Sequence, residues 1–233
     1  FSPKIAKIKI YAQYFRIYLL TRGKFRDKFF SILNHEADIY VIQECEDPRN
    51  HPEFSEFYSN FIWYGETSHK GLGIFAKPSI SLQKNNWDTY CLRHFVSVKV
   101  NGQFDLLGVW ACSPYIEEYY IYQTINYDRF TPQTIVVGDF NSNAIWDKQH
   151  GKRNHSQVVS ELEQLGLVSA YHYTTKELHG KESKHTFCLY KNESKRYHID
   201  YCFVAPERIC SFAILDSKEW LSLSDHFPIQ IAI

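Results

Sequence analysis

The sequence has no methionine, no excess of charge of one sign and no long uninterrupted apolar segment. Its 233 residues carry 26 Lys and Arg against 26 Asp and Glu, so the formal net charge is zero. This balance excludes a generally basic nucleic-acid coat protein, but it does not exclude a local basic patch. Every apolar segment meets a charged residue within about ten positions, which excludes a membrane-spanning helix.

The six cysteines are scattered and include no C-x-x-C pair, which argues against a thiolate zinc site and favours reduced, mostly buried thiols. Lys4, Lys7 and Lys9 interrupt the only early apolar segment, so we predict no secretion signal and expect a cytoplasmic protein. A hydrophobic content of 44% with 22% charged residues is typical of a globular chain. The length suits one domain over residues 1–233.

Charge is distributed unevenly along the chain. Residues 4–28 are mostly basic, residues 36–66 mostly acidic, and residues 148–196 basic and rich in histidine. Most such runs are solvated faces. An acidic site flanked by basic segments also suits a divalent metal beside a phosphate.

Strand and helix patterns alternate, which predicts an α/β fold built of two packed sheets with helices outside. A half-buried strand is expected at residues 5–14, an amphipathic helix at 23–36, and a buried strand at 38–43 that places Glu44 at its end. Asn154 is expected to cap a helix that Gly166 ends. Further strands are expected at residues 71–77, 95–100, 104–110, 134–137, 186–190, 198–204, 211–216 and 227–233.

Several polar residues stand where a predicted strand meets a loop, which is where α/β folds place their chemistry. Asp139 and Asn141 follow T-I-V-V-G, and Asp225 and His226 precede the last strand. Each has a simpler interpretation, such as an Asx turn at Asp139. Asp200, between apolar neighbours in H-I-D-Y, needs a partner because a buried carboxylate is costly without one.

Five segments together resemble the endonuclease/exonuclease/phosphatase superfamily, which includes deoxyribonuclease I and exonuclease III. They are V-I-Q-E (41–44), G-L-G-I-F-A-K (71–77), V-V-G-D-F-N (136–141), H-I-D-Y (198–201) and S-D-H-F-P-I (224–229). The resemblance spans about residues 5–233. It implies a four-layer α/β/β/α sandwich of two packed mixed sheets flanked by helices, with the site at one sheet edge.

The resemblance also implies a divalent-metal-dependent phosphodiesterase that attacks the ester in line with an activated water. Asp139 would orient and deprotonate the water, and Asn141 would donate its amide to a phosphate oxygen. Asp200 would hold His226 protonated toward the scissile phosphate. Nucleic acid is the expected substrate, and the alternatives are a small-molecule or lipid phosphoester hydrolase and a non-catalytic phosphate-binding relative.

Glu44 and Asp225 are the metal ligands that the resemblance implies, with Mg²⁺ or Mn²⁺ as the ion. Carboxylate oxygens are the hard ligands that such ions prefer. The family's asparagine at the end of the first strand is missing. Gln13 replaces it in one alignment, and in another the position falls at residues 20–22 and carries no amide.

The family also places a histidine or tyrosine after the strand that here ends in L-L-G-V-W-A-C. Trp110, Ala111 and Cys112 stand there instead, and none donates a proton well. Tyr115 is a candidate substitute, with a surface position as the alternative. These departures bear on metal affinity and on stabilisation of the transition state.

Two further segments bear on the partner. Residues 148–155 are basic and can contact a nucleic-acid backbone, or they form an ordinary loop before a helix cap. The aromatic-rich residues 115–130 can stack on bases, but packing of a helix against a sheet is favoured. No membrane association and no obligate protein partner are expected, and the chain is expected to be a monomer.

Overall fold

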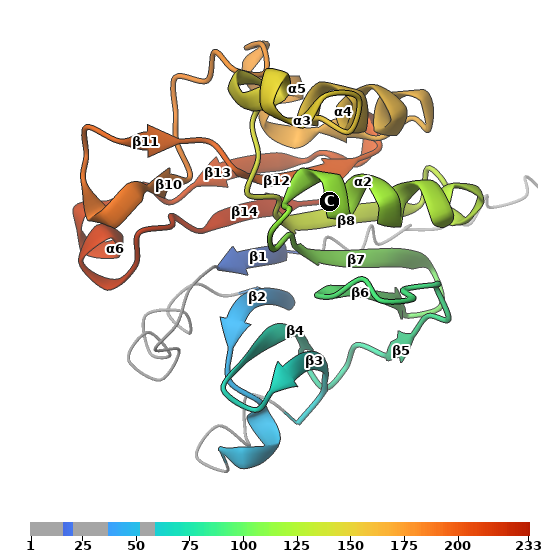
Figure 1. Ribbon diagram of the computed structural model, residues 1–233. Coiled ribbons are helices and arrows are strands. Elements are labelled where there is room, and N and C mark those ends of the chain that lie inside the picture. Colours follow the sequence, from blue (N-terminus) through green and yellow to red (C-terminus); the bar gives the residue numbers. More distant parts are fainter. Residues whose placement is uncertain (1–15, 21–36, 52–58) are drawn as a thin grey trace, which may run out of the picture.

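Two six-stranded mixed sheets pack face to face in the computed structural model, which describes residues 16–20, 37–51 and 59–233 (Figure 1). The first sheet has the order β13-β14-β1-β2-β4-β3, and the second has the order β5-β6-β7-β8-β12-β9. Each contains one parallel pair, β1 with β2 and β7 with β8. The strand predicted at residues 5–14 and the helix predicted at 23–36 lie outside the described residues.

The strands and helices have the following bounds. The first sheet consists of β1 (Arg16–Leu20), β2 (Ile39–Cys45), β3 (Phe61–Thr67), β4 (Lys70–Ala76), β13 (Ser211–Ile214) and β14 (Ile229–Ala232). The second consists of β5 (Leu82–Lys84), β6 (Phe95–Val100), β7 (Phe104–Trp110), β8 (Thr134–Asp139), β9 (Val168–Ser169) and β12 (Asp200–Val204). The remaining elements are the hairpin β10 (Phe187–Cys188) and β11 (Arg196–Tyr197) and the helices α2 (Ile116–Ile125), α3 (Asp147–His150), α4 (His155–Gln164), α5 (Ala170–Thr175) and α6 (Lys218–Leu223).

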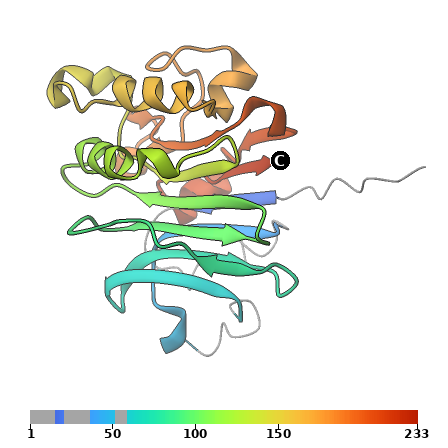
Figure 2. The same cartoon turned by 90° about the vertical axis from the view of Figure 1, so that its right-hand side faces the viewer.

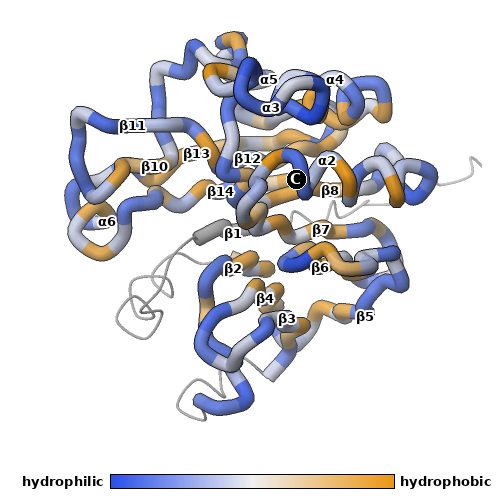
Figure 3. Tube along the Cα trace, viewed as in Figure 1, coloured by the Kyte–Doolittle hydropathy of each residue, from blue (hydrophilic) through white to orange (hydrophobic). Residues whose placement is uncertain are grey.

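Strand β7 shows why the central strands are hydrophobic on both faces. All seven of its residues are buried. A Cβ placed at Gly108 would contact Val41 and Ile74 of the first sheet, so this face lies in the core between the sheets. The alternate residues Leu107 and Val109 belong to the core beneath the helices. In Figure 3 the hydrophobic residues accordingly follow the strands, whereas the loops are hydrophilic.

The outer face of the second sheet is covered by α2 and α4, as Figure 2 shows. Tyr119 and Tyr122 of α2 are fully buried, which confirms that this aromatic segment packs against the sheet. The Asn154 side chain accepts a hydrogen bond from the Gln157 amide and so caps α4 as predicted. The α/β class with packed sheets flanked by helices is therefore confirmed.

Gly138 precedes Asp139 in β8, and no larger residue fits at its position. A Cβ there would lie 1.9 Å from the carbonyl oxygen of Val109, which faces Gly138 across the parallel pair of β7 and β8. The glycine of G-D-F-N therefore lets the two strands approach closely. Their carboxyl ends, Trp110 and Asp139, consequently lie side by side.

Several predicted boundaries need correction. The strand expected at residues 186–190 is limited to Phe187–Cys188, because Tyr190 and Lys191 adopt left-handed backbone conformations with φ of 55° and 56° that a strand cannot continue through. Strands β3 and β5 were not predicted. All six thiols are free, but only Cys45, Cys188 and Cys202 are buried. Within the described ranges, no helix combines the length and apolar character that spanning a bilayer requires.

Candidate active site

One edge of the paired sheets collects the polar residues that the sequence singles out. The parallel pairing of β7 with β8 sets Trp110 opposite Asp139. The antiparallel pairing of β8 with β12 sets Asp139 opposite Asp200, so the end of one strand meets the start of the next. Both carboxyl groups are buried at this edge.

Asp139, Asp200 and His226 form a compact buried cluster. Each offers one ligand or hydrogen-bonding atom, and these atoms all lie within 4.8 Å of one another. The Nδ1 atom of His226 lies 3.0 Å from Oδ2 of Asp200, so the partner that buried Asp200 requires is this imidazole. The structure thus brings together three residues that are separated by up to 87 positions, 226 minus 139, along the chain.

Asn141 holds the Asp139 carboxylate in place. Its backbone N–H donates to Oδ1 of Asp139 at 2.8 Å, which is the Asx turn, and its side-chain amide donates to Oδ2 at 3.0 Å. The same amide donates to the carbonyl oxygen of Ala111 at 3.1 Å. Asn141 has a φ of 46°, a left-handed conformation that asparagine tolerates better than most residues. In this structure its amide therefore orients Asp139, and the predicted contact with a phosphate stays a prediction.

The pKa of Asp139 is raised well above its usual range. Burial is the main cause, and the negative charge of Asp200 adds to it. The His226 charge and the Asn141 N–H oppose the rise, and the charge of Glu44 reinforces it. A carboxylate with a raised pKa is a stronger base, which suits a group that takes a proton from water.

The pKa of His226 is raised to about 9. Burial, the largest single influence, lowers it, but the charge of Asp200 and its hydrogen bond, followed by the charges of Asp139 and Asp225, outweigh burial. His226 is therefore a cation at neutral pH. A protonated imidazole at this edge can donate a hydrogen bond to an anionic ligand.

Thr186 fixes the start of β12, a role that the sequence patterns did not reveal. Its hydroxyl oxygen accepts hydrogen bonds from the backbone N–H groups of Ile199 and Asp200, both at 3.0 Å. Its carbonyl oxygen accepts from the N–H of Phe227 at 2.7 Å. Thr186 thereby ties the segment that carries Asp200 to the segment that carries His226. A buried threonine beside a short strand gives no distinctive sequence signal.

Glu44 lies in a bulge of β2 and not beyond its end as the sequence suggested. The register of β2 with β4 shifts between Gln43 and Cys45, and Glu44 has a φ of 55°. Its Oε1 lies 3.2 Å from Nζ of Lys70, the first residue of β4. The bulge turns the Glu44 side chain out of the strand alternation and toward the site edge.

Lys70 and His94 gather on the Trp110 ring, where the sequence lacks the expected histidine or tyrosine. The Nζ of Lys70 lies 5.1 Å from the Trp110 ring centroid, and the His94 imidazole lies 4.4 Å from it. His94 is buried, and burial lowers its pKa, so it is neutral at pH 7. Lys70 begins β4 and His94 directly precedes β6, and both strands run away from the site. Their position at the start of a strand is the signal that sequence reasoning missed. Tyr115, in contrast, is 44% exposed.

The strand described near the family's asparagine position is β1, which ends at Leu20. Leu20 pairs with Ile42, so β1 ends beside the carboxyl end of β2. Residues 21–22 lie outside the described residues, so both alignments stay predictions. Gln13 lies outside the described residues.

The residues present fit a hard divalent cation. The carboxylates of Asp139, Asp200 and Glu44 are close enough for the charges of the last two to raise the pKa of the first. Asp225 is buried and adds negative charge next to His226. Several carboxylates crowded at one edge are stabilised by a bound cation, and oxygen ligands of this type suit Mg²⁺ or Mn²⁺.

No protein-family model matches the sequence, and no curated protein matches it significantly. Solved structures do match its fold. A 3'-5' exonuclease (NExo) from Neisseria meningitidis has a TM-score of 0.68 at 16% identity, covering 93% of this chain and 98% of its own. AP endonuclease LMAP from Leishmania major has a TM-score of 0.67 at 9% identity, covering 94% and 87%. TDP2 from D. rerio, complexed with a single-strand DNA product, has a TM-score of 0.61 at 14% identity, covering 94% and 98%.

These three proteins belong to the endonuclease/exonuclease/phosphatase superfamily. The chain therefore has the fold of that superfamily, as its sequence resemblance predicts. The likeness to the Neisseria exonuclease covers 93% of the chain.

Proposed function

We propose that this chain is a divalent-metal-dependent phosphodiesterase that hydrolyses phosphoester bonds in nucleic acid. One observation carries the proposal: the buried cluster of Asp139, Asp200 and His226 at the edge of two packed sheets. It holds a carboxylate whose pKa is raised beside an imidazole that is a cation at neutral pH. Ester hydrolysis requires a base that takes a proton from water and a cation that donates to the phosphate, and the two shifted pKa values suit these roles.

Asp139 accepts the proton of the attacking water in this proposal. Two hydrogen bonds from Asn141 fix its carboxylate, so little reorganisation accompanies proton transfer. His226 donates a hydrogen bond to a phosphate oxygen and offsets the charge that develops there. Asp200 is a positioning residue, because its Oδ2 binds Nδ1 of His226 and leaves Nε2 as the nitrogen for the substrate.

Glu44 and Asp225 would hold the divalent ion, Mg²⁺ or Mn²⁺. When bound, the ion supplies positive charge that neutralises the phosphoryl oxygens and lowers the pKa of a bound water. Lys70, paired with Glu44 and half exposed, adds a cation that can reach a phosphate from the same edge.

Nucleic acid is the substrate class that the comparisons support. The titles of two similar structures describe a DNA hairpin product and a single-strand DNA product. In this chain Lys148, Lys152 and Arg153 are exposed in and after α3, in the segment that follows Asn141. Exposed basic side chains in such a segment can contact the phosphate backbone.

A substrate panel tests the proposal. Plasmid DNA, an abasic duplex, a 3'-phosphorylated duplex, single-stranded DNA and RNA are compared with a small phosphomonoester and a phospholipid. Each is incubated with Mg²⁺, with Mn²⁺ or with a chelator. We expect cleavage of at least one nucleic acid that stops in chelator and returns when the ion is restored in excess.

Other outcomes of this panel would contradict the proposal. Turnover of only the small ester or the lipid would assign the site to a different phosphoester. Binding of nucleic acid without cleavage under every ion condition would indicate the non-catalytic relative, for which the missing asparagine and the Trp110 substitution are the structural reasons.

A further inference from the structure

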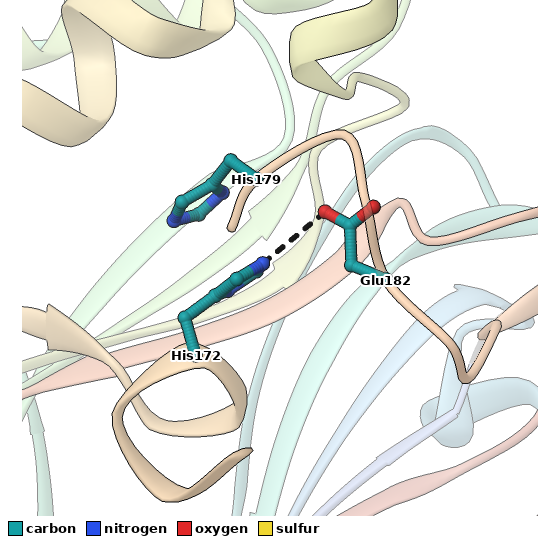
Figure 4. A group of neighbouring side chains, drawn as sticks. All are labelled: His172, His179 and Glu182. Atoms are coloured by element: carbon teal, nitrogen blue, oxygen red, sulfur yellow. Dashed lines mark hydrogen bonds and ion pairs between the residues drawn. The ribbon is translucent and has the colours of Figure 1, made fainter. Parts of the chain in front are cut away.

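A second cluster of ligating side chains lies among α5 and the loop that follows it. His172 is in α5, and His179 and Glu182 are in the loop (Figure 4). The three residues offer one ligand atom each within 4.8 Å of one another. The imidazoles of His172 and His179 stack with their centroids 3.5 Å apart, and Nε2 of His172 lies 3.2 Å from Oε1 of Glu182.

Each member of this cluster is also held by a second group. Ser169 Oγ lies 2.8 Å from Nδ1 of His172, and His155 Nε2 lies 3.1 Å from Nδ1 of His179. Glu182 Oε1 accepts from the amide of Asn143 at 3.0 Å. Metal-ligating side chains in proteins are oriented by outer contacts of this kind.

Two buried imidazole nitrogens at the rim of the cluster are unsatisfied. Nδ1 of His155 and Nε2 of His198 have no hydrogen-bond partner among the described residues, and both side chains are at least 98% buried. Buried imidazole nitrogens without a partner are costly, and a ligand bound beside them would offset part of that cost.

We propose that His172, His179 and Glu182 bind Zn²⁺ and that the ion joins α5 to the loop over residues 176–185. Zn²⁺ binds nitrogen and carboxylate oxygen at about 2.0–2.2 Å, so neighbouring ligand atoms of a four-coordinate site stand about 3.3 Å apart. The separation of 3.2 Å within the His172–Glu182 pair is close to that value, and the ligand atoms of all three residues lie within 4.8 Å of one another. Neutral imidazole is the form that Zn²⁺ requires.

The location of the cluster gives the ion a structural role. The loop over residues 176–185 has no strand or helix of its own, so few backbone hydrogen bonds hold it. A cavity of about 340 Å³, lined by His172 and His179 among others, opens beside the cluster and provides a route for the ion. Asn143, in the turn after Asn141, donates to Glu182 of the cluster and to the hydroxyl of Tyr201. The ring of His179 also stacks on Tyr201, which directly follows Asp200 in β12. The ion would therefore also stabilise the start of β12.

Zinc binding to the whole purified chain tests the proposal. After chelation and dialysis, we expect the chain to bind one Zn²⁺ in the presence of excess Mg²⁺. Saturating Zn²⁺ should raise the Tm by roughly 5–10 °C at about 100 times the Kd. Co²⁺ as the probe should give the visible absorption of a nitrogen- and oxygen-ligated four- or five-coordinate ion.

Variants of the proposed ligands test whether Zn²⁺ binds at this cluster. His172→Ala and His179→Ala should each lose at least about tenfold in Zn²⁺ affinity and lose the Tm rise. His185→Ala changes a histidine at the end of the same loop that is not part of the cluster, and this variant should keep both the Zn²⁺ affinity and the Tm rise. If a variant does not fold, the Co²⁺ spectrum and the Tm response of the unchanged chain still decide the question. Two results would show that the cluster is only a hydrogen-bonded network. One is absence of Zn²⁺ binding by the unchanged chain, and the other is a Zn²⁺ affinity of the two cluster variants equal to that of the unchanged chain.

Discussion

Asp139→Asn should lower kcat on the cleaved nucleic acid at least about 10²-fold, because the variant removes the base and leaves the shape of the site. The Tm should stay the same or rise. The reason is the raised pKa of Asp139: burial favours its neutral form, so its contribution to stability is present at low pH and is lost as the pH rises through the folded-state pKa. A neutral amide at this position removes that cost at pH 7.

The control for this prediction is Asp105→Asn. Asp105 is also a buried acid of the second sheet, but it lies near the opposite end of β7 and pairs with Lys99 at 2.9 Å. This variant should keep activity within about twofold and lose some stability, since it breaks a partly buried ion pair. Rates and melting curves of both variants, measured side by side, check the assignment. Equal activity of Asp139→Asn and the unchanged chain would remove Asp139 from the mechanism.

The pH dependence should report the state of His226. We expect activity to fall as the pH rises through about 9, the pKa of His226, because only the cation donates to the phosphate. Asp200→Asn should move this fall to lower pH by about 2 units or more. The variant removes the charge and hydrogen bond that raise the pKa, and it leaves burial, which lowers it. Profiles of kcat/KM against pH for the two proteins measure the shift.

The Tm should also depend on the protonation of His226 and decrease as His226 loses its proton. The folded-state pKa of His226 is above its ordinary value of 6.5, so its contribution is fully present below about pH 6.5 and is lost as the pH rises through about 9. The Tm of the unchanged chain should therefore decrease between pH 7 and 10 more than that of Asp200→Asn. Asp216→Asn, which changes an exposed acid paired with Lys184, is the matched control and should leave both the activity profile and this difference in place. A profile that does not move in Asp200→Asn would contradict the positioning role of Asp200.

The fold could be predicted because its central strands leave clear traces in the sequence. Strands β6 and β7 were predicted with their observed bounds, since both are mostly apolar segments on either side of an Asn-Gly turn whose two residues have φ of 50° and 67°. Strand β3 was missed because its apolar residues do not alternate with polar ones: half-buried Trp63 is followed by exposed Tyr64. The end of the segment at residues 186–190 was wrong because Tyr190 and Lys191 adopt left-handed conformations where the sequence has neither the glycine nor the asparagine that usually marks such a turn.

The site was predictable to the extent that its residues directly border strands. Asp139 and Asp200 are adjacent in the sheet because β8 pairs with β12, a pairing that the sequence patterns did not predict. Lys70 escaped notice because its approach to Trp110 depends on how the two sheets pack. His94 lies opposite Trp110 through the pairing of β6 with β7, and the register of that predicted hairpin is the signal that could have found it. In the sequence, the only sign of the histidine cluster is the high histidine content of residues 148–196. Its convergence depends on the path of a loop without regular structure.

In the proposed mechanism, water attacks phosphorus at the Asp139–His226 site. A single-turnover digestion in ¹⁸O-labelled water, with mass spectrometry of the product, follows that step. We expect one labelled oxygen on the phosphate of the product from the unchanged chain and almost no product from Asp139→Asn in the same time. Unlabelled phosphate in the product, or labelled product formed equally fast by both proteins, would contradict the proposed mechanism.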